Sequence, residues 1–452
     1  MSDGNLQQAG FYALSAFKVT SYDKKKSVDL KLVVYSFNLF ESMSLGALQG
    51  SAVIYDSWDL IRNFPFVCEE FLDITYTDFF GVERTERMFV YGITDISYPS
   101  DEKQGIMQYT LNFVSIGRMF SETYNIRRAY RADSTNQGRI SDYANSIFDA
   151  YYVKPLSVGG FTSKDIVIEP TTGSERLIVP CLNPESAMNF MARRAFSSTS
   201  KTQSYRFFES RERYWFATNE FMATIAVDPV GYFPGGIDPG LASALGIKEK
   251  TPPVFVMSYA GDVGPERQVQ LMYELQAIDF GMISNTLDDI NFGGYRRRLW
   301  EVDIVNGAIT SQDFTYTGYG NTDFQLPVHA GEFLDTRMSK ISESYVMKDY
   351  ASPGATTGDA LRSNPYYSPL YSVKPMSFYH YDRNRITTRI YGRNTLFAGD
   401  IITLQLYEHS AESAITEDDQ RSGDYIVESI DNKFIESTYT QDLVLSRAGL
   451  VR

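Results

Sequence analysis

The residues that most often carry catalysis or bind metals are few in this chain and far apart. None of its three histidines belongs to an HExxH motif or lies near a cysteine pair, so the spacing of a zinc site is missing. The sequence has no GxxxxGK[ST] phosphate loop and no GxSxG serine motif. We therefore expect no enzymatic activity, no cofactor and no bound metal. The histidines are His329, His380 and His409.

Three pairs of adjacent acids could in principle supply the two carboxylates of a glycosidase. Neighbouring residues point to opposite faces of a strand or lie in loops, so solvation is the stronger interpretation of each pair. Ser21-Tyr22-Asp23-Lys24 satisfies the SxxK pattern of some hydrolases but lacks its companion motifs, and we interpret it as a turn. The acid pairs are Glu69-Glu70, Asp288-Asp289 and Asp418-Asp419.

A basic cluster, Tyr295-Arg296-Arg297-Arg298, could contact phosphate. An exposed turn or a salt-bridge donor between subunits is the more ordinary interpretation. The whole chain carries 42 Lys and Arg against 56 Asp and Glu, a formal net charge of −14. Tight binding to a nucleic-acid backbone needs positive charge, so the composition argues against it. It leaves open a surface past which DNA moves without sticking.

The composition is that of a globular protein with several domains. The 452 residues are 43% apolar and 22% charged, enough to bury a substantial core. Two cysteines, Cys68 and Cys181, cannot build a disulfide framework, which favours folding in a reducing cytoplasm. The start of the sequence has no signal-peptide pattern, and no run of about 18 apolar residues predicts a membrane span.

The elements that must position these residues are mostly strands. The 32 Tyr and 30 Phe residues fit a β-rich chain and equally fit extensive interfaces. Alternating apolar residues predict a strand over 28–34 and a C-terminal hairpin with a polar break at 436–438. Further strands are expected over 50–56, 71–76, 88–96, 108–116, 299–305 and 313–316.

The central part of the sequence has a helical pattern. Five apolar residues share one face of a helix predicted over 140–148. A second helix has Asn183 as its cap and Pro184 at its first position, followed by apolar residues at helical spacing. A hairpin is expected over 204–217 and a further helix over 266–279. The apolar residues of the two helical faces are Ile140, Tyr143, Ala144, Ile147 and Phe148, then Ala187, Met188, Met191, Ala192 and Ala195.

Three segments near the N-terminus return in the same order near the C-terminus. EEFLDITYTD at 69–78 aligns with GDIITLQLYE at 399–408, and FVYGITDI at 89–96 aligns with YIVESIDN at 425–432. QYTLNFVSIG at 108–117 resembles TYTQDLVLSR at 438–447. Together they predict one β-domain present twice in the chain.

One stretch, FNLFESMSLGALQGSAVIYDSWDLIRNFPFVCEEFLDITY at 37–76, resembles the N-terminal tube-like domain of baseplate central hub proteins from contractile-tailed (myovirus) bacteriophages. The C-terminal part resembles the second tube-like domain of that family, which is related to the hub part of VgrG-type spike proteins. Cys68 stands where the family usually has glycine before an acidic pair. The matching positions, interpreted as structural, are Glu41, Ser42, Gly50, Asp56, Pro65, Glu69 and Glu70, then Gly399, Asp400 and Gly423.

The resemblance implies a β-rich α+β fold with two tail-tube-like antiparallel β-barrel or sandwich domains and an inserted helix-containing domain. We place the first tube-like domain at 1–120 and the inserted domain, with a Pro- and Gly-rich connection, at 121–265. The second tube-like domain begins at 266–324 and resumes at 386–452. Between its parts, 325–385 is an irregular insertion that we expect to contact a partner.

The function implied by the resemblance is structural. Three copies would form a pseudo-sixfold ring that joins the hexameric tail tube to a trimeric spike and leaves a channel for genome ejection. Implied partners are further copies of the chain, a tail tube or tube-initiator protein, a separate spike protein, and baseplate wedge or tape-measure proteins. DNA is present only in transit. The implied location is the tail baseplate of the virion, after assembly in the host bacterial cytoplasm.

Two alternatives stay open at this point. The chain could be the hub or spike component of a contractile injection system. It could also be a tail-associated cell-wall hydrolase, which would need two acids converging in a cleft. For the leading interpretation we expect a homotrimer, equivalent places for strands 71–76 and 401–406, and a neutral to acidic channel wall.

Overall fold

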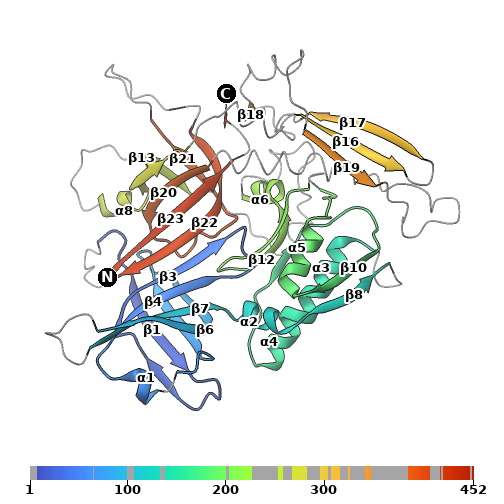
Figure 1. Ribbon diagram of the computed structural model, residues 1–452. Helices are drawn as coiled ribbons and strands as arrows, with labels where there is room; N and C mark the ends of the chain where they lie inside the picture. The colour runs from blue at the N-terminus through green and yellow to red at the C-terminus, as the bar shows by residue number, and fades with distance from the viewer. Residues whose placement is uncertain are drawn as a thin grey trace.

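The computed structural model shows a β-rich chain whose helices are concentrated in one inserted segment (Figure 1). The predicted β-rich α+β class is therefore confirmed, whereas closure of either tube-like domain into a barrel or sandwich stays a prediction. The structure describes residues 8–64, 66–98, 106–132, 138–199, 203–226, 253–257, 267–281, 296–303, 307–315, 324–325, 342–347, 385–407, 418, 421–447 and 450–451.

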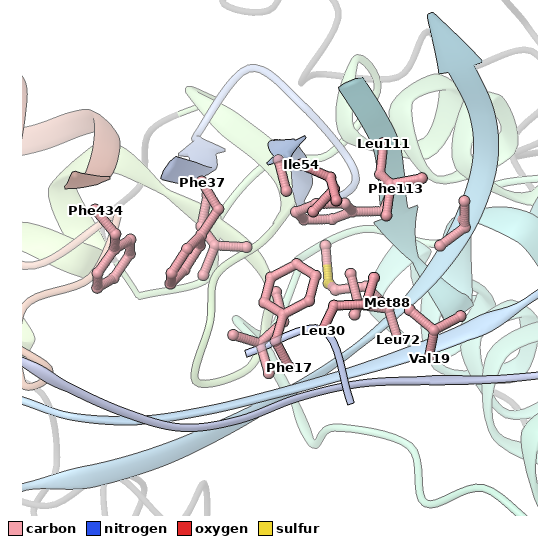
Figure 2. Packing of buried hydrophobic residues seen from close by; sticks show 14 of the residues in the cluster. Phe17, Val19, Leu30, Phe37, Ile54, Leu72, Met88, Leu111, Phe113 and Phe434 are labelled. Atoms are coloured by element: carbon pink, nitrogen blue, oxygen red, sulfur yellow. The ribbon is translucent and has the colours of Figure 1, made fainter. Parts of the chain in front are cut away.

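The first β-unit is an antiparallel sheet whose strands lie in the order β3-β4-β7-β6-β5-β1-β2. Alternate side chains of each strand point to one side of the sheet, and there the apolar ones form a single core (Figure 2). The strands are β1 (Ala13–Thr20), β2 (Ser27–Asp29), β3 (Val34–Ser42), β4 (Gln49–Asp56), β5 (Phe71–Thr77), β6 (Glu83–Ser97) and β7 (Met107–Ser115), and the short helix α1 (Leu60–Asn63) joins β4 to β5.

The second β-unit repeats this order of neighbours as β15-β20-β23-β22-β21-β13-β14. In it β15 takes the place of β3, β20 of β4, β23 of β7, β22 of β6, β21 of β5 and β13 of β1. One difference is that β13 runs parallel to β21, whereas β1 is antiparallel to β5. The strands are β13 (Val254–Met257), β14 (Glu274–Leu275), β15 (Ala277–Asp279), β20 (Arg385–Tyr391), β21 (Ile401–Gln405), β22 (Gly423–Ile435) and β23 (Thr438–Ser446).

Two β-bulges fix the register between the units. The extra residue is Tyr91 in β6 and Glu428 in β22. The sequence alignment pairs Phe89 with Tyr425, whereas the strand partners make Phe89 equivalent to Ile426. A shift of one residue turns a strand's side chains to the opposite face, so the alignment is wrong by one residue at this point. It is wrong by two residues in the third segment, where the strand partners make Val114 equivalent to Ser446 and not to Val444.

The two β-units are joined into one 14-stranded sheet because the second half of β22 pairs with β3. At the end of β22, Phe434 leaves its own unit and enters the core of the first (Figure 2). Its ring stacks on Phe37 with 4.2 Å between centroids and on Tyr439 with 4.1 Å. Burial of one such side chain contributes roughly 1.5–3 kcal/mol, so the connection is apolar as well as hydrogen-bonded.

The inserted segment packs its helices against two small sheets, β8-β10 and β11-β12-β9. The predicted helices over 140–148 and from Pro184 are confirmed, with all ten predicted apolar residues buried. Asn183 caps the second by accepting a hydrogen bond from the Ser186 N–H. The elements are α2 (Ile116–Thr123), β8 (Ile126–Tyr130), α3 (Ile140–Phe148), the π-helical turn η1 (Asp149–Val153), α4 (Lys154–Val158), β9 (Ile166–Ile168), β10 (Leu177–Leu182), α5 (Pro184–Ala192), β11 (Tyr205–Glu209), β12 (Tyr214–Thr218) and α6 (Asn219–Ala226).

A separate three-stranded sheet, β17-β16-β19, is drawn in orange in Figure 1. Its strands are β16 (Arg296–Asp303), β17 (Ala308–Thr315) and β19 (Ser342–Met347). The described arginines of the basic cluster lie in β16, and Arg298 pairs with Asp313 of the same chain. The exposed-turn interpretation is therefore wrong for these residues. Two short strands, β18 (Phe324–Gln325) and β24 (Leu450–Val451), pair with each other.

Two further sequence expectations are corrected. The strand expected over 28–34 is broken after β2, because the Asp29 carboxylate accepts the Lys31 N–H and closes a turn. Leu32 is consequently 82% exposed. The helix expected over 266–279 is only one short helix, α8 (Arg267–Leu271), followed by β14 and β15. Pairing of β15 with the edge of β20 outweighs the local helical pattern there.

Candidate functional site

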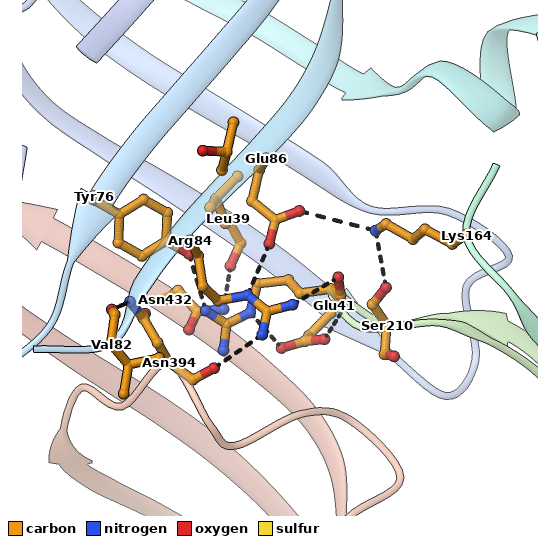
Figure 3. A network of polar contacts seen from close by, with 12 residues as sticks. Leu39, Glu41, Tyr76, Val82, Arg84, Glu86, Lys164, Ser210, Asn394 and Asn432 are labelled. Atoms are coloured by element: carbon orange, nitrogen blue, oxygen red, sulfur yellow. Dashed lines mark hydrogen bonds and ion pairs between the residues drawn. The ribbon is translucent and has the colours of Figure 1, made fainter. Parts of the chain in front are cut away.

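The most unusual feature of the molecule is a fully buried arginine at the tip of a hairpin. Arg211 lies in the turn between β11 and β12, a position that commonly faces water. Its side chain is 0% exposed because the hairpin tip inserts between the two β-units (Figure 3). A buried charge needs partners that replace its hydration.

Those partners come from both β-units. From the first unit, Glu41 accepts the Arg211 Nε–H at 3.0 Å and its backbone N–H at 2.9 Å, and the Tyr76 hydroxyl lies 3.1 Å from Nη1. From the second unit, the Tyr439 hydroxyl lies 3.1 Å from Nη1 and the Leu396 carbonyl 2.7 Å from Nη2. One guanidinium therefore connects the inserted segment to both sheets.

The electrostatics keep this arginine charged. Burial by itself lowers the pKa of the Arg211 guanidinium, but the surrounding tyrosines and carboxylates outweigh burial and the net pKa is well above its ordinary value. Burial raises the pKa of Tyr76 to about 12 and also raises that of Tyr439. Both phenols are therefore neutral at physiological pH and serve as hydrogen-bonding groups.

A second set of ion pairs surrounds this centre. Arg84 Nη2 donates to the Arg211 carbonyl at 3.1 Å and Nη1 to the Asn394 carbonyl at 3.2 Å. Lys164 Nζ lies 3.9 Å from Glu86 (Figure 3) and 3.0 Å from Glu209. We call Arg211, Glu41, Tyr76, Tyr439, Leu396, Arg84, Glu86, Lys164 and Glu209 the arginine junction.

The junction borders a pocket of about 380 Å³ that contains two acids, Glu86 and Glu209. Two acids in a cleft are what the hydrolase alternative requires. Here, however, Lys164 ion-pairs with both carboxylates, and Arg84 contacts Glu86 as well. This arrangement fits a structural salt-bridge network better than a general acid and base.

Of the predicted motif residues, only Glu41 belongs to the junction. Ser42 is buried beside it at the end of β3, with its hydroxyl 2.9 Å from that of Ser44. Gly50 lies in β4 where a Cβ would come within 2.2 Å of the Phe113 ring. Each of these three residues makes a different kind of internal contact, and their structural role stays a prediction.

The predicted acids of the first unit organise turns. The Asp56 carboxylate accepts the Trp58 N–H at 2.8 Å and the Leu60 N–H at 2.6 Å, which positions the start of α1. The Glu70 carboxylate accepts the Val67 N–H at 2.6 Å just before β5. Glu69 is exposed. Pro65 lies outside the described residues, as do the three histidines, Asp288, Asp289 and Asp419.

The turn that precedes β5 in the first unit has a counterpart before β21 in the second unit. Asp400 precedes β21 and accepts the Phe397 N–H at 3.0 Å, three residues earlier, as Glu70 does with Val67. Gly399 has a φ of 91°, and Gly423, at the start of β22, has 120°, both in the region that favours glycine.

Sequence reasoning missed the centre of the junction. The sequence predicted only a hairpin over 204–217, and a charged residue in such a turn is ordinarily exposed. A usable signal lay in β3, where Phe37, Leu39 and Glu41 alternate onto the inward face. An acid at a core-facing position requires a buried partner.

Within the part of the chain that the structure describes, no group of His, Cys, Asp or Glu residues could hold a metal ion. Among the same residues, no helix is both long and apolar enough to cross a membrane.

Comparison with solved structures identifies the fold. A tail protein from Neisseria meningitidis MC58 has a TM-score of 0.51 at 8% identity, covering 98% of each chain. The 43 kDa tail protein of prophage MuSo2 from Shewanella oneidensis has a TM-score of 0.50 at 7% identity, covering 96% of this chain and 98% of that one. A PdpA–VgrG complex gives 0.46 at 11% identity, over 99% of this chain and 66% of its own.

No protein-family pattern matches the sequence, and no curated protein is significantly similar to it. At such low identity the solved structures establish the fold alone. This chain has the fold of phage tail proteins, as the sequence resemblance predicted.

Proposed function

We propose that this protein is a structural baseplate hub of a contractile phage tail. In this proposal three copies form a ring that joins the tail tube to a separate spike and leaves a channel for genome ejection. The observation that carries the proposal is the repeated strand order of two β-units within one chain that has a tail-protein fold. A threefold ring of such chains offers six similar units to a sixfold tube.

The arginine junction supports a structural role. It connects the hairpin tip to both β-units through buried, charge-assisted hydrogen bonds, which are stronger than neutral ones. A component that transmits force between tube and spike needs its units held in one arrangement. The ion-paired state of Glu86 and Glu209 supports the absence of hydrolytic activity.

The experiment is electron microscopy of tails that carry a tagged copy of the chain. We expect density for three copies at the junction between the tube and the spike. A location elsewhere in the particle, or a stable sixfold arrangement without threefold order, would contradict the proposal. Recovery of the chain from a contractile injection particle instead of a virion would favour the first alternative.

A cell-wall hydrolysis assay tests the hydrolase alternative. We expect no turnover by the purified protein. Turnover that is lost in both Glu86→Gln and Glu209→Gln would establish the opposite, provided that both variants unfold at the same denaturant concentration as the unchanged protein.

A further inference from the structure

The second half of the long central strand is covered in one β-unit and open in the other. In β22 this half pairs with β3, and Ile430, Asn432 and Phe434 are buried. The first half of β6 pairs with β5 along the same edge. Beyond Val90 no described strand pairs with that edge of β6, although the Ile93 backbone still hydrogen-bonds the Cys68 thiol, and 94–98 are all exposed.

The residue that corresponds to Phe434 is Tyr98. A second bulge, at Asp95 and Ile96, shifts the end of β6 relative to β7. As a result Ser97 lies opposite Gln108 of β7. Gln108 is equivalent to Thr440 of β23, which is the partner of Lys433. Tyr98, the next residue, therefore takes the place of Phe434, but it is 73% exposed where Phe434 is 0% exposed.

The strand that corresponds to β3 is β15. On one side β15 pairs with β20, as β3 pairs with β4. Its other edge pairs with no strand among the residues that the structure describes. Its Ile278 takes the place of Phe37, the residue on which Phe434 stacks. Ile278 and Phe280 form a partly exposed margin of the second core.

We propose that a second copy of this chain docks here by strand addition. The open edge of β15 in one copy pairs with the second half of β6 in the next. Tyr98 then packs beside Ile278 of the neighbouring copy, as Phe434 packs beside Phe37 within one chain. The contact copies a connection that the chain already makes internally.

The physical reasons favour a second copy as the occupant. An exposed strand edge with apolar side chains is normally covered or blocked by charge, yet Tyr91 and Ile96 are each 57% exposed. The contact joins two different surfaces of the chain, so it propagates from copy to copy and closes into a ring where the rotation permits. Closure at three copies rests on the proposed function.

Cross-linking tests the register. A mixture of the Tyr98→Cys chain and the Ile278→Cys chain is oxidised, and disulfide-linked dimers are counted on non-reducing gels and mapped by mass spectrometry. Facing residues of paired strands lie close enough for a disulfide. Each single variant alone controls for disulfides formed with Cys68 or Cys181. Gln276→Cys, two residues before Ile278 and directly before β15, controls for the register.

We expect mixed dimers from Tyr98→Cys with Ile278→Cys, and a several-fold lower yield with Gln276→Cys. We also expect Tyr98→Asp to abolish oligomers in native mass spectrometry. Tyr22→Asp is the matched control, since Tyr22 is 60% exposed in a hairpin tip, and should leave oligomers unchanged.

Oligomers that form without this cross-link, or that survive Tyr98→Asp, would overturn the inference and leave the proposed ring standing. A chain that stays monomeric without cross-links up to high concentration would also overturn it, because the pairing needs no third protein. The proposed function is tested separately, by locating the chain in the assembled tail with electron microscopy.

Discussion

At the scale of single residues, Arg211 makes more buried hydrogen bonds than its position in a hairpin turn suggests. Its guanidinium donates to groups from three strands and one loop of the two β-units, and Glu41 also accepts its backbone N–H. Replacing one member of a buried ion pair leaves the other charge without compensation. The junction should therefore respond strongly to single substitutions and less to paired ones.

We expect Arg211→Met to lower the free energy of unfolding by roughly 3–5 kcal/mol, because it leaves the Glu41 carboxylate buried and unpaired. The double variant Arg211→Met with Glu41→Gln should recover part of this loss. Urea unfolding followed by fluorescence measures both. Arg62→Ala is the control, since its ion pair with Asp59 is largely exposed and should change stability by less than about 1 kcal/mol. Equal effects of Arg211→Met and Arg62→Ala would contradict this account.

Cys68 is a residue-scale exception that can be tested directly. It has a φ of 63°, a region where non-glycine residues cost of order 1 kcal/mol. We expect Cys68→Gly to stabilise the protein by up to about 1 kcal/mol, because glycine adopts this conformation freely. Cys68→Ala is the control that removes the thiol but keeps the strain. If the alanine variant is the more stable of the two, backbone strain is not the cause.

Alkaline pH should weaken the junction. Burial raises the pKa of Tyr76 to about 12, whereas a phenol in the unfolded chain titrates near pH 10. Below pH ~10 the phenol is protonated in both states, so its contribution to stability is fully present. As pH rises from about 10 to the folded pKa of about 12, only the unfolded state releases this proton, and the contribution is lost.

Urea unfolding at several pH values between neutral and strongly alkaline measures the effect, at about 1.4 kcal/mol for each unit of pKa difference. Phenolate absorbance is measured on the same samples without urea. The buried tyrosines should ionise only when the protein unfolds. Tyr76→Phe should flatten the alkaline decline. A decline of equal slope in that variant would assign the effect to other tyrosines, such as Tyr12, whose pKa burial also raises to about 12.

At the scale of elements, close packing between strands decides which glycines matter. A Cβ at Gly50 would lie 2.2 Å from the Phe113 ring and 2.5 Å from the Asn38 carbonyl oxygen, whereas nothing lies within 4 Å of one at Gly92. We expect Gly50→Ala to destabilise the protein by roughly 1–3 kcal/mol and Gly92→Ala to have little effect. Thermal unfolding of the two strand variants measures the contrast. Similar melting temperatures for both would show that the first sheet adjusts more freely than its packing indicates.

Several strands and the two central helices were predictable because each carries its pattern locally. Alternation marked β5, and Asn183-Pro184 marked the start of α5. The break after Asp29 and the short β15 were not, since a side-chain cap and an edge pairing decide them. Arg211 hydrogen-bonds residues up to 228 positions away in the sequence, so no local pattern could reveal Arg211 or its tyrosine partners.

At the scale of the whole molecule, the two β-units share one sheet. The contact between them shows how one unit of this fold can join another by strand pairing. The β22–β3 pairing and the Phe434 insertion connect them within the chain. The open second half of β6 and the edge of β15 lie at the corresponding places. A repeated contact of this kind produces an assembly in which successive units have similar surroundings, whether a chain boundary intervenes or not.

The last prediction concerns DNA, which in the proposed function passes through the ring. A wall rich in Lys and Arg would neutralise phosphates and bind through release of counterions, which slows passage. With a net charge of −14, we expect the assembled protein to leave the mobility of duplex DNA unchanged at physiological salt and at low salt. Net charge does not fix which surface carries the acids, so an electrostatic map of the assembled ring is the second measurement. A continuous belt of Lys and Arg along the bore, or a mobility shift that weakens steeply as salt is added, would contradict a neutral to acidic channel.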